Sequence, residues 1–158
     1  MASSLMIHSF KKNDAGFTLI EMLVVVAIIG LLSSTILVAL GPARDKAKDS
    51  RIIQEVNQVR SLAETLYIGN YDALESLPST NIQNPDLKAL SDDITAQGGV
   101  LMIIKSAPAP AKTYAVFSSL NTKGGDSQNP TTQYYCVDSA GHSGVRNSAP
   151  TGPVCPSI

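Results

Sequence analysis

Histidine and cysteine are rare in this chain, which has two of each among its 158 residues. The histidines are His8 and His142, and neither forms a recognisable group with a serine nucleophile and an orienting acid, as acyl-transfer catalysis requires. Because only His142 lies near the two cysteines, the four ligands of a structural zinc site are missing. We therefore expect neither an enzyme nor a zinc protein.

A strong excess of charge of either sign is also missing. The 12 basic and 13 acidic residues give a formal net charge of −1 at pH 7. A nearly neutral chain gives no reason to expect nucleic-acid binding by its bulk surface. We predict no specific nucleic-acid partner.

Ionisable side chains are almost absent from one long stretch, where Glu21 is the only one between Phe17 and Gly41. About 20 apolar residues cross the hydrocarbon core of a bilayer, so residues 17–42 are long enough to span it. A charge there costs roughly 2.5–3.5 kcal/mol on insertion scales, so we expect Glu21 to have a cationic partner. A signal peptide fits less well. Its apolar core has only about 7–15 residues, and its small-residue cleavage site follows that core. Here the small residues Ala15-Gly16 come before the apolar run.

The same run is expected to be helical, with a break or kink where it ends. Gly30 lies inside it, and Gly41 and Pro42 follow, of which proline removes a backbone donor and clashes with the preceding turn. From Ala43 the helix is expected to resume and to run to about residue 68. Its apolar residues then recur every three or four positions, which predicts one buried stripe. The stripe consists of Ile52, Val56, Val59, Ala63 and Leu66.

The rest of the chain predicts a small antiparallel sheet. Residues 70–98 are expected to form a loop with one brief helix near residues 86–90. Strands are predicted at 100–104, 113–117 and 131–137, with a short fourth strand near Val145, because apolar and β-branched runs alternate there with turn residues. The predicted fold is α+β, a long N-terminal helix with an apolar first half and an amphipathic second half packed on the sheet.

The two cysteines, Cys136 and Cys155, both follow the apolar run, which favours one disulfide in an oxidising compartment over two free thiols. Such a bond closes a loop of about 20 residues at the C-terminus and contributes on the order of 3 kcal/mol in the chain-entropy model.

The start of the apolar run resembles the prepilin signature of type IV pilins and of the related pseudopilins of type II secretion. The matching residues are Lys11-Lys12-Asn13-Asp14-Ala15-Gly16, then Phe17-Thr18-Leu19-Ile20-Glu21, then the run itself. The resemblance implies that a prepilin peptidase removes residues 1–16 by cutting between Gly16 and Phe17, that Phe17 is then N-methylated, and that Glu21 guides assembly. Residues 17–42 then form the transmembrane and fibre-core helix, and residues 43–158 the globular pilin domain.

The function implied by the resemblance is that of a structural subunit, the major pilin of a type IV pilus. Such filaments serve attachment, twitching motility or DNA uptake. The alternatives are a minor pilin, a type II secretion pseudopilin, and a membrane-anchored binding protein that never polymerises. Implied partners are further copies of the chain, the prepilin peptidase, an assembly platform protein and a cytoplasmic ATPase. The chain would reside in the cytoplasmic membrane before it enters an extracellular filament.

No cofactor is expected. Some pseudopilins bind calcium, and Asp126 and Asp138 are the candidate ligands here. Calcium takes six to eight oxygens, however, and no dense acidic loop is present, so solvated loop carboxylates are the better interpretation.

The charges on either side of the run leave its orientation open. Basic residues tend to remain cytoplasmic. Two lysines precede the run and four basic residues follow it, namely Arg44, Lys46, Lys48 and Arg51. The charge count favours a cytoplasmic C-terminal part, whereas the cysteine pair and the family resemblance favour an external one, which we expect.

Overall fold

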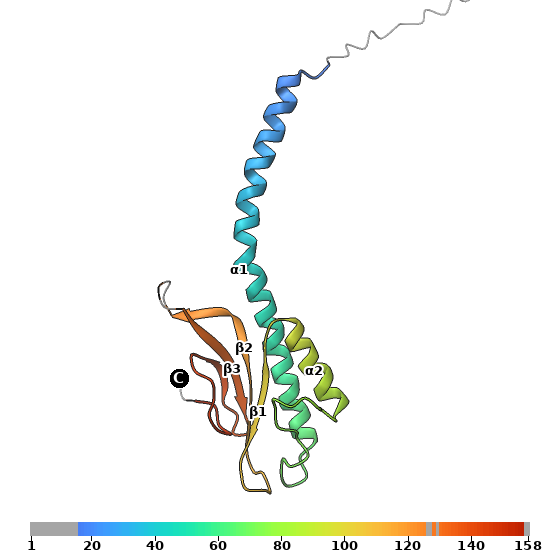
Figure 1. The fold of residues 1–158 in the computed structure, drawn as a ribbon, viewed down its shortest axis with the longest axis vertical. Helices are drawn as coiled ribbons and strands as arrows, with labels where there is room; N and C mark the ends of the chain where they lie inside the picture. The colour runs from blue at the N-terminus through green and yellow to red at the C-terminus, as the bar shows by residue number, and fades with distance from the viewer. Residues whose placement is uncertain (1–15, 126–127, 129, 157–158) are drawn as a thin grey trace, which may run out of the picture. The chain divides into compact units, whose positions relative to one another are not determined.

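The computed structural model describes residues 16–125, 128 and 130–156 (Figure 1). The chain forms two compact units, one ending at Ala39 and one beginning at Leu40. In chain order the elements are α1 (Leu19–Thr65), α2 (Pro85–Ala96), β1 (Leu101–Lys105), β2 (Tyr114–Gly125), β3 (Pro130–Asp138) and β4 (Ser143–Arg146).

The strands form one antiparallel sheet in the order β1-β2-β3-β4, which confirms the predicted α+β fold. Each predicted strand is present, including the short one at Val145. β2 is longer than expected, because Lys123, Gly124 and Gly125 pair with β3 beyond a register shift that begins at Ser119. The irregularity lets one strand continue past the point where the alternation of the sequence stops.

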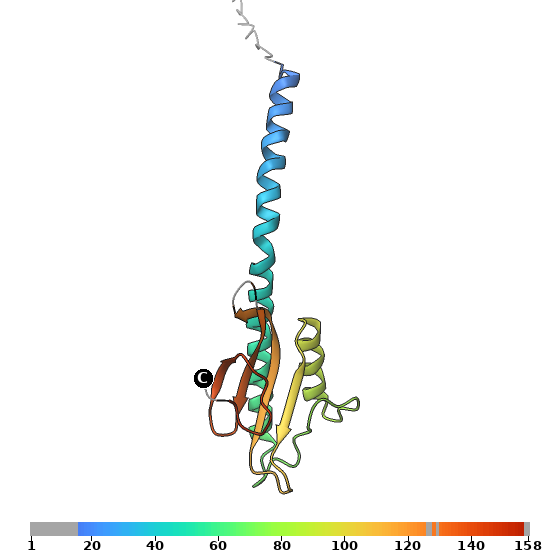
Figure 2. The ribbon, with the colours of Figure 1, turned by 60° about the vertical axis from the view of Figure 1, so that its left-hand side comes forward.

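The core lies between one face of the sheet and the helices of the second unit. Ile52, Val56, Val59 and Ala63 of α1 are fully buried, and Leu66 is half-buried against the same core, which confirms the predicted stripe. They share one apolar cluster with residues of α2 and of the strands, among them Leu87, Ile94, Ile103, Tyr114, Val116 and Val137. Figure 2 shows the later part of α1 (green) lying along the sheet.

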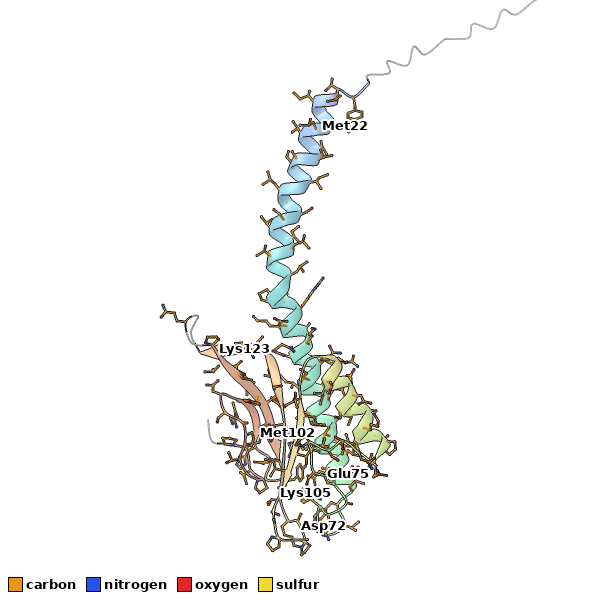
Figure 3. The ribbon with its side chains drawn as sticks, in the orientation of Figure 1. Met22, Asp72, Glu75, Met102, Lys105 and Lys123 are labelled. Atoms are coloured by element: carbon orange, nitrogen blue, oxygen red, sulfur yellow. A yellow bond between two sulfur atoms is a disulfide. The ribbon has the colours of Figure 1, made fainter. Side chains whose placement is uncertain are left out.

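The opposite face of the sheet is covered by the C-terminal segment. The predicted disulfide between Cys136 of β3 and Cys155 is present and joins residues 19 apart in sequence. Phe117 shares one buried cluster with both cysteines, and Met102, labelled in Figure 3, packs against this cluster. Tyr134 packs on this face and Tyr135 on the helix face, and both are half-buried.

The predicted helix break is wrong. α1 is helical without interruption from Leu19 to Thr65, through Gly30 and Gly41 and with Pro42 inside it. Pro42 removes one donor, which deprives only the carbonyl of Val38 of its partner, and each glycine costs roughly 1 kcal/mol relative to alanine. These local costs are smaller than the stabilisation that the hydrogen bonds of the long helix on either side provide. The helix ends two to three residues before the predicted position, ahead of Gly69, whose φ is +89°.

A buried carboxylate fastens α1 to β2. Asp49 is 5% exposed and accepts four hydrogen bonds at the irregularity in β2. Two come from the backbone and side-chain amides of Asn121, at 2.6 and 3.0 Å, and two from the backbone and hydroxyl of Thr122, at 2.9 and 2.5 Å. Burial by itself raises the pKa of Asp49, but these hydrogen bonds outweigh it and lower the pKa below its usual value.

Asp49→Ala is expected to lower the free energy of unfolding by about 3 kcal/mol, because it leaves two backbone donors of β2 without an acceptor. Urea unfolding followed by near-ultraviolet circular dichroism of the tyrosines measures the loss. The matched control is Asp92→Ala, which removes the same charge from an exposed pair with Lys88 and should cost less than about 1 kcal/mol. Equal stability of the two variants would contradict the role assigned to Asp49.

Glu55 is a second buried acid of α1. Its carboxylate lies 3.8 Å from the Arg51 guanidinium, which also contacts Asp93 of α2 at 2.8 Å. Burial raises the pKa of Glu55, and its hydrogen bond with Asp93 adds to that shift. The three side chains link α2 to α1 because α2, longer than the predicted brief helix, covers this side of α1.

Candidate functional site: the start of the N-terminal helix

The predicted cleavage point lies just before α1, outside any helix or strand. Gly16 and Phe17 are exposed, and the side chain of Phe17 is 80% accessible. No described atom lies within 4 Å of the position that a Cβ on Gly16 would take. The bond between the two residues is therefore open to an enzyme from outside.

Glu21 closes a reciprocal cap at the start of α1. The backbone N–H and the hydroxyl of Thr18 both donate to Glu21 Oε2 at 2.8 Å, and the Glu21 N–H donates to the Thr18 hydroxyl at 3.3 Å. This is a capping box, in which a threonine at the N-cap and a glutamate three residues later satisfy each other's backbone donors. Our sequence reasoning missed Thr18, although the Thr-x-x-Glu spacing ahead of an apolar run is the signal that identifies it.

Within the described part of the chain, the cap brings no cationic partner to Glu21. Among residues 16–125, 128 and 130–156, no basic group lies within ion-pair distance of its carboxylate, and only Oε2 is engaged by Thr18. Glu21 Oε1 is thus available to a donor from another source. The helix start thus holds a carboxylate that accepts hydrogen bonds from Thr18 and that no cation of the described residues neutralises.

The apolar residues around Glu21 are exposed on every side of the first unit. Large apolar side chains from Leu19 to Val38 have between 48% and 82% of their surface accessible. Within the described part of the chain, α1 is the one helix long and apolar enough to cross a membrane. A continuous apolar surface of this size requires cover by lipid or by other protein.

The predicted site residues fall into two separate groups. Gly16, Phe17 and Glu21 belong to the first unit, whereas Cys136 and Cys155 lie in the core of the second. Gly30, Gly41 and Pro42 are positions within α1 that join neither group.

Asp138, one of the two candidate calcium ligands, has a structural task instead. Its fully buried carboxylate accepts hydrogen bonds at 2.9–3.0 Å from the backbone of Ala140, His142 and Cys155, and contacts His142 Nδ1 at 2.9 Å. Asp126 lies outside the described residues, and within the described ones no group of three His, Cys, Asp or Glu side chains is placed to hold a metal. Asp138 therefore holds the disulfide-closed segment on β3.

The hydrogen bonds of Asp138 predict acid sensitivity. Burial by itself raises its pKa, but the donors from Cys155 and His142 outweigh burial and leave the pKa below its usual value. The hydrogen bonds of Asp138 therefore stabilise the folded chain fully above about pH 3.9, the pKa of an aspartate in the unfolded chain. This stabilisation is lost as the pH falls through the lower pKa that Asp138 has in the folded chain. The free energy of unfolding, measured by urea titration, should fall below about pH 4, and Asp138→Asn should flatten that slope. An unchanged slope would contradict this assignment.

Comparison with known proteins agrees with the geometry of the helix start. Residues 11–37 match the family model described as the prokaryotic N-terminal methylation motif. The chain is 30% identical over 104 residues to the type IV major fimbrial protein FimA of Dichelobacter nodosus, covering 64% of this chain and 67% of the relative. It is 37% identical over 59 residues to the type IV wide pilus major component PilA4 of Thermus thermophilus, covering 37% of this chain and 45% of the relative.

No solved structure matches the chain. The match to the fimbrial protein nevertheless covers two thirds of that relative and extends far beyond the N-terminal motif. A long N-terminal helix, an antiparallel sheet and a C-terminal disulfide accompany it. The chain belongs to the type IV pilin family.

Proposed function

We propose that this chain is the major subunit of a type IV pilus and polymerises through its N-terminal helix into a surface filament. The observation that carries the proposal is a carboxylate, Glu21, that no cation of the described residues neutralises, at the start of a helix whose apolar surface is exposed all round. Both relatives are named as major pilus or fimbrial components, which favours the major over a minor subunit.

The assembly step depends on the free chain start that cleavage creates. A prepilin peptidase cuts between Gly16 and Phe17, and the Phe17 amine, which is then methylated, remains a cation. In an apolar surrounding this ammonium and the Glu21 carboxylate are each costly alone and are stabilised as a pair. When the ammonium of one subunit pairs with Glu21 of the next, the pair sets the axial step between helices. The apolar surfaces then cover one another, which replaces lipid around each helix.

The remaining parts of the proposal follow from the same step. Before assembly the subunit resides in the cytoplasmic membrane with its second unit outside, where the Cys136–Cys155 bond is stable. An assembly platform protein and a cytoplasmic ATPase act as partners. The filament serves attachment, twitching motility or DNA uptake. A secretion pseudopilin is the alternative, and the names of the relatives favour the pilus.

Shearing cells and imaging the supernatant tests this function. Antibody against the second unit should decorate long filaments along their whole length. Decoration confined to filament tips would indicate a minor pilin. The absence of the chain from any filament would contradict polymerisation and favour a membrane-anchored binding protein.

Gly16→Leu is expected to block removal of residues 1–16, because a bulky side chain next to the scissile bond cannot occupy a peptidase site that accepts glycine. The chain should then run on a gel as a larger species that retains those 16 residues. Gly30→Leu is the matched control, since Gly30 also has nothing within 4 Å of its Cβ position and lies beyond the cleavage point. Normal processing of Gly16→Leu would contradict the assigned cut.

A further inference from the structure

A hollow of about 500 Å³ lies in the second unit where α1 meets β2, β3 and β4. Lys46 of α1 and Lys123 of β2 both line it, and Figure 3 labels Lys123 near the end of its strand. Its apolar lining is formed by Ile53, Leu120 and Val145, of which Val145 is 42% exposed. The hollow therefore combines two cations from different elements with an apolar floor.

The two lysines have no carboxylate partner within the described ranges. Both are exposed, and Lys123 Nζ makes only a long contact of 3.4 Å with the Thr132 hydroxyl. Asp49 also lines the hollow, but its oxygens are occupied by the four donors of Asn121 and Thr122.

The lining of the hollow itself carries an excess of positive charge. Arg44 and Lys48 lie two positions from Lys46 along α1, on another face of the helix, and do not line it. Two cations, Lys46 and Lys123, thus stand against one lining carboxylate, Asp49. The excess favours an anionic ligand.

The place of Lys46 along α1 identifies the source of that anion. Lys46 follows the last residue of the proposed membrane segment, Pro42, by four positions, which is about 6 Å of helix rise. The headgroup layer of a bilayer extends roughly 5–7 Å beyond the hydrocarbon core on each side. Lys46 therefore lies at the depth of the lipid phosphates when residues 17–42 span the membrane.

We propose that Lys46 and Lys123 bind the phosphate of an anionic phospholipid while the subunit waits in the membrane, with Ile53, Leu120 and Val145 contacting the glycerol region. The inference rests on the membrane stage of the proposed function. It also gives a physical reason for the basic residues that follow the membrane segment on the outer side, where such residues are normally disfavoured. An anionic headgroup neutralises them there.

Native mass spectrometry of the full mature chain in detergent, titrated with phosphatidylglycerol or phosphatidylcholine, tests the proposal. Phosphatidylglycerol should bind more tightly than phosphatidylcholine. The double variant Lys46→Gln/Lys123→Gln should bind phosphatidylglycerol roughly 30-fold more weakly, since each cation near an anionic surface contributes about 1 kcal/mol. Lys46→Arg/Lys123→Arg should retain binding. The matched control is Lys88→Gln/Lys112→Gln, which removes two lysines that do not line the hollow and should leave binding unchanged.

Equal binding of the two lipids would overturn the proposal, and so would equal weakening of binding by the control variant. Displacement of phosphatidylglycerol by inorganic phosphate at similar concentration would also overturn it, because it would indicate a site for free phosphate. A detergent-soluble dimer lost only in the Lys46→Gln/Lys123→Gln variant would assign the hollow to a second copy of the chain instead. Filament imaging of the same variants separates the two claims. Filaments without lipid preference contradict this inference alone, and lipid preference without filaments contradicts the proposed polymerisation alone.

Discussion

Glu21→Gln is expected to insert into the membrane and to lose its leader normally, yet to yield no surface filaments. Glutamine at this position of a capping box still accepts the Thr18 donors, so the start of α1 keeps its local structure. Only the negative charge is removed, and with it the partner of the next subunit's ammonium. Filament yield in sheared supernatants, measured against the amount of processed chain in the membrane, should fall below detection.

Thr18→Ala is the complementary control. It removes the hydroxyl of the cap, at a cost of about 1 kcal/mol, but leaves the carboxylate charged. Filaments should therefore still form, at reduced yield at most. If Glu21→Gln assembled normally while Thr18→Ala did not, Glu21 would act by capping its own helix, and the intersubunit charge pair would be wrong.

Removing the disulfide with Cys136→Ser/Cys155→Ser should strongly lower the stability of the second unit. The bond closes a 19-residue separation, and its loss costs on the order of 3 kcal/mol by chain entropy. The melting temperature should fall by roughly 10–15 °C for a unit of this size. Because the chain has no tryptophan, near-ultraviolet circular dichroism of the buried Tyr114 reports this transition.

Asp138 should share in that loss, because the Cys155 N–H donates to its carboxylate at 2.9 Å. A double-mutant cycle between the cysteine pair and Asp138→Asn is therefore expected to be non-additive by about 1 kcal/mol or more. An unchanged melting temperature on loss of both sulfurs would contradict the account. So would strict additivity with Asp138→Asn, since it would show that the two anchors of the C-terminal segment act independently.

The parts of the fold that depend on periodicity were predictable from the sequence. Ile52, Val56, Val59 and Ala63 recur at helical spacing and are fully buried. The strands were predictable because alternation and turn residues are local signals. The disulfide was predictable because the chain has only two cysteines. At the helix start, Glu21 stood out because it is the lone charge in an apolar run.

The parts that depend on tertiary contacts were not predictable. Asp49 and Glu55 look like solvated helix residues, and only the irregularity in β2 and the position of α2 explain their burial. The break expected at Pro42 is absent because the helix on either side of it is long enough to outweigh the one hydrogen bond that proline removes. The extension of β2 to Gly125 depends on pairing with β3, which no local pattern reveals.

The mass of the N-terminal peptide from sheared filaments tests the central claim most directly, because it examines cleavage, methylation and polymerisation in one sample. The account predicts that the peptide begins at Phe17 and is one methyl group heavier than its unmodified sequence. Filaments built from chains that retain residues 1–16 would contradict it, since the ammonium that Glu21 is proposed to bind would not exist.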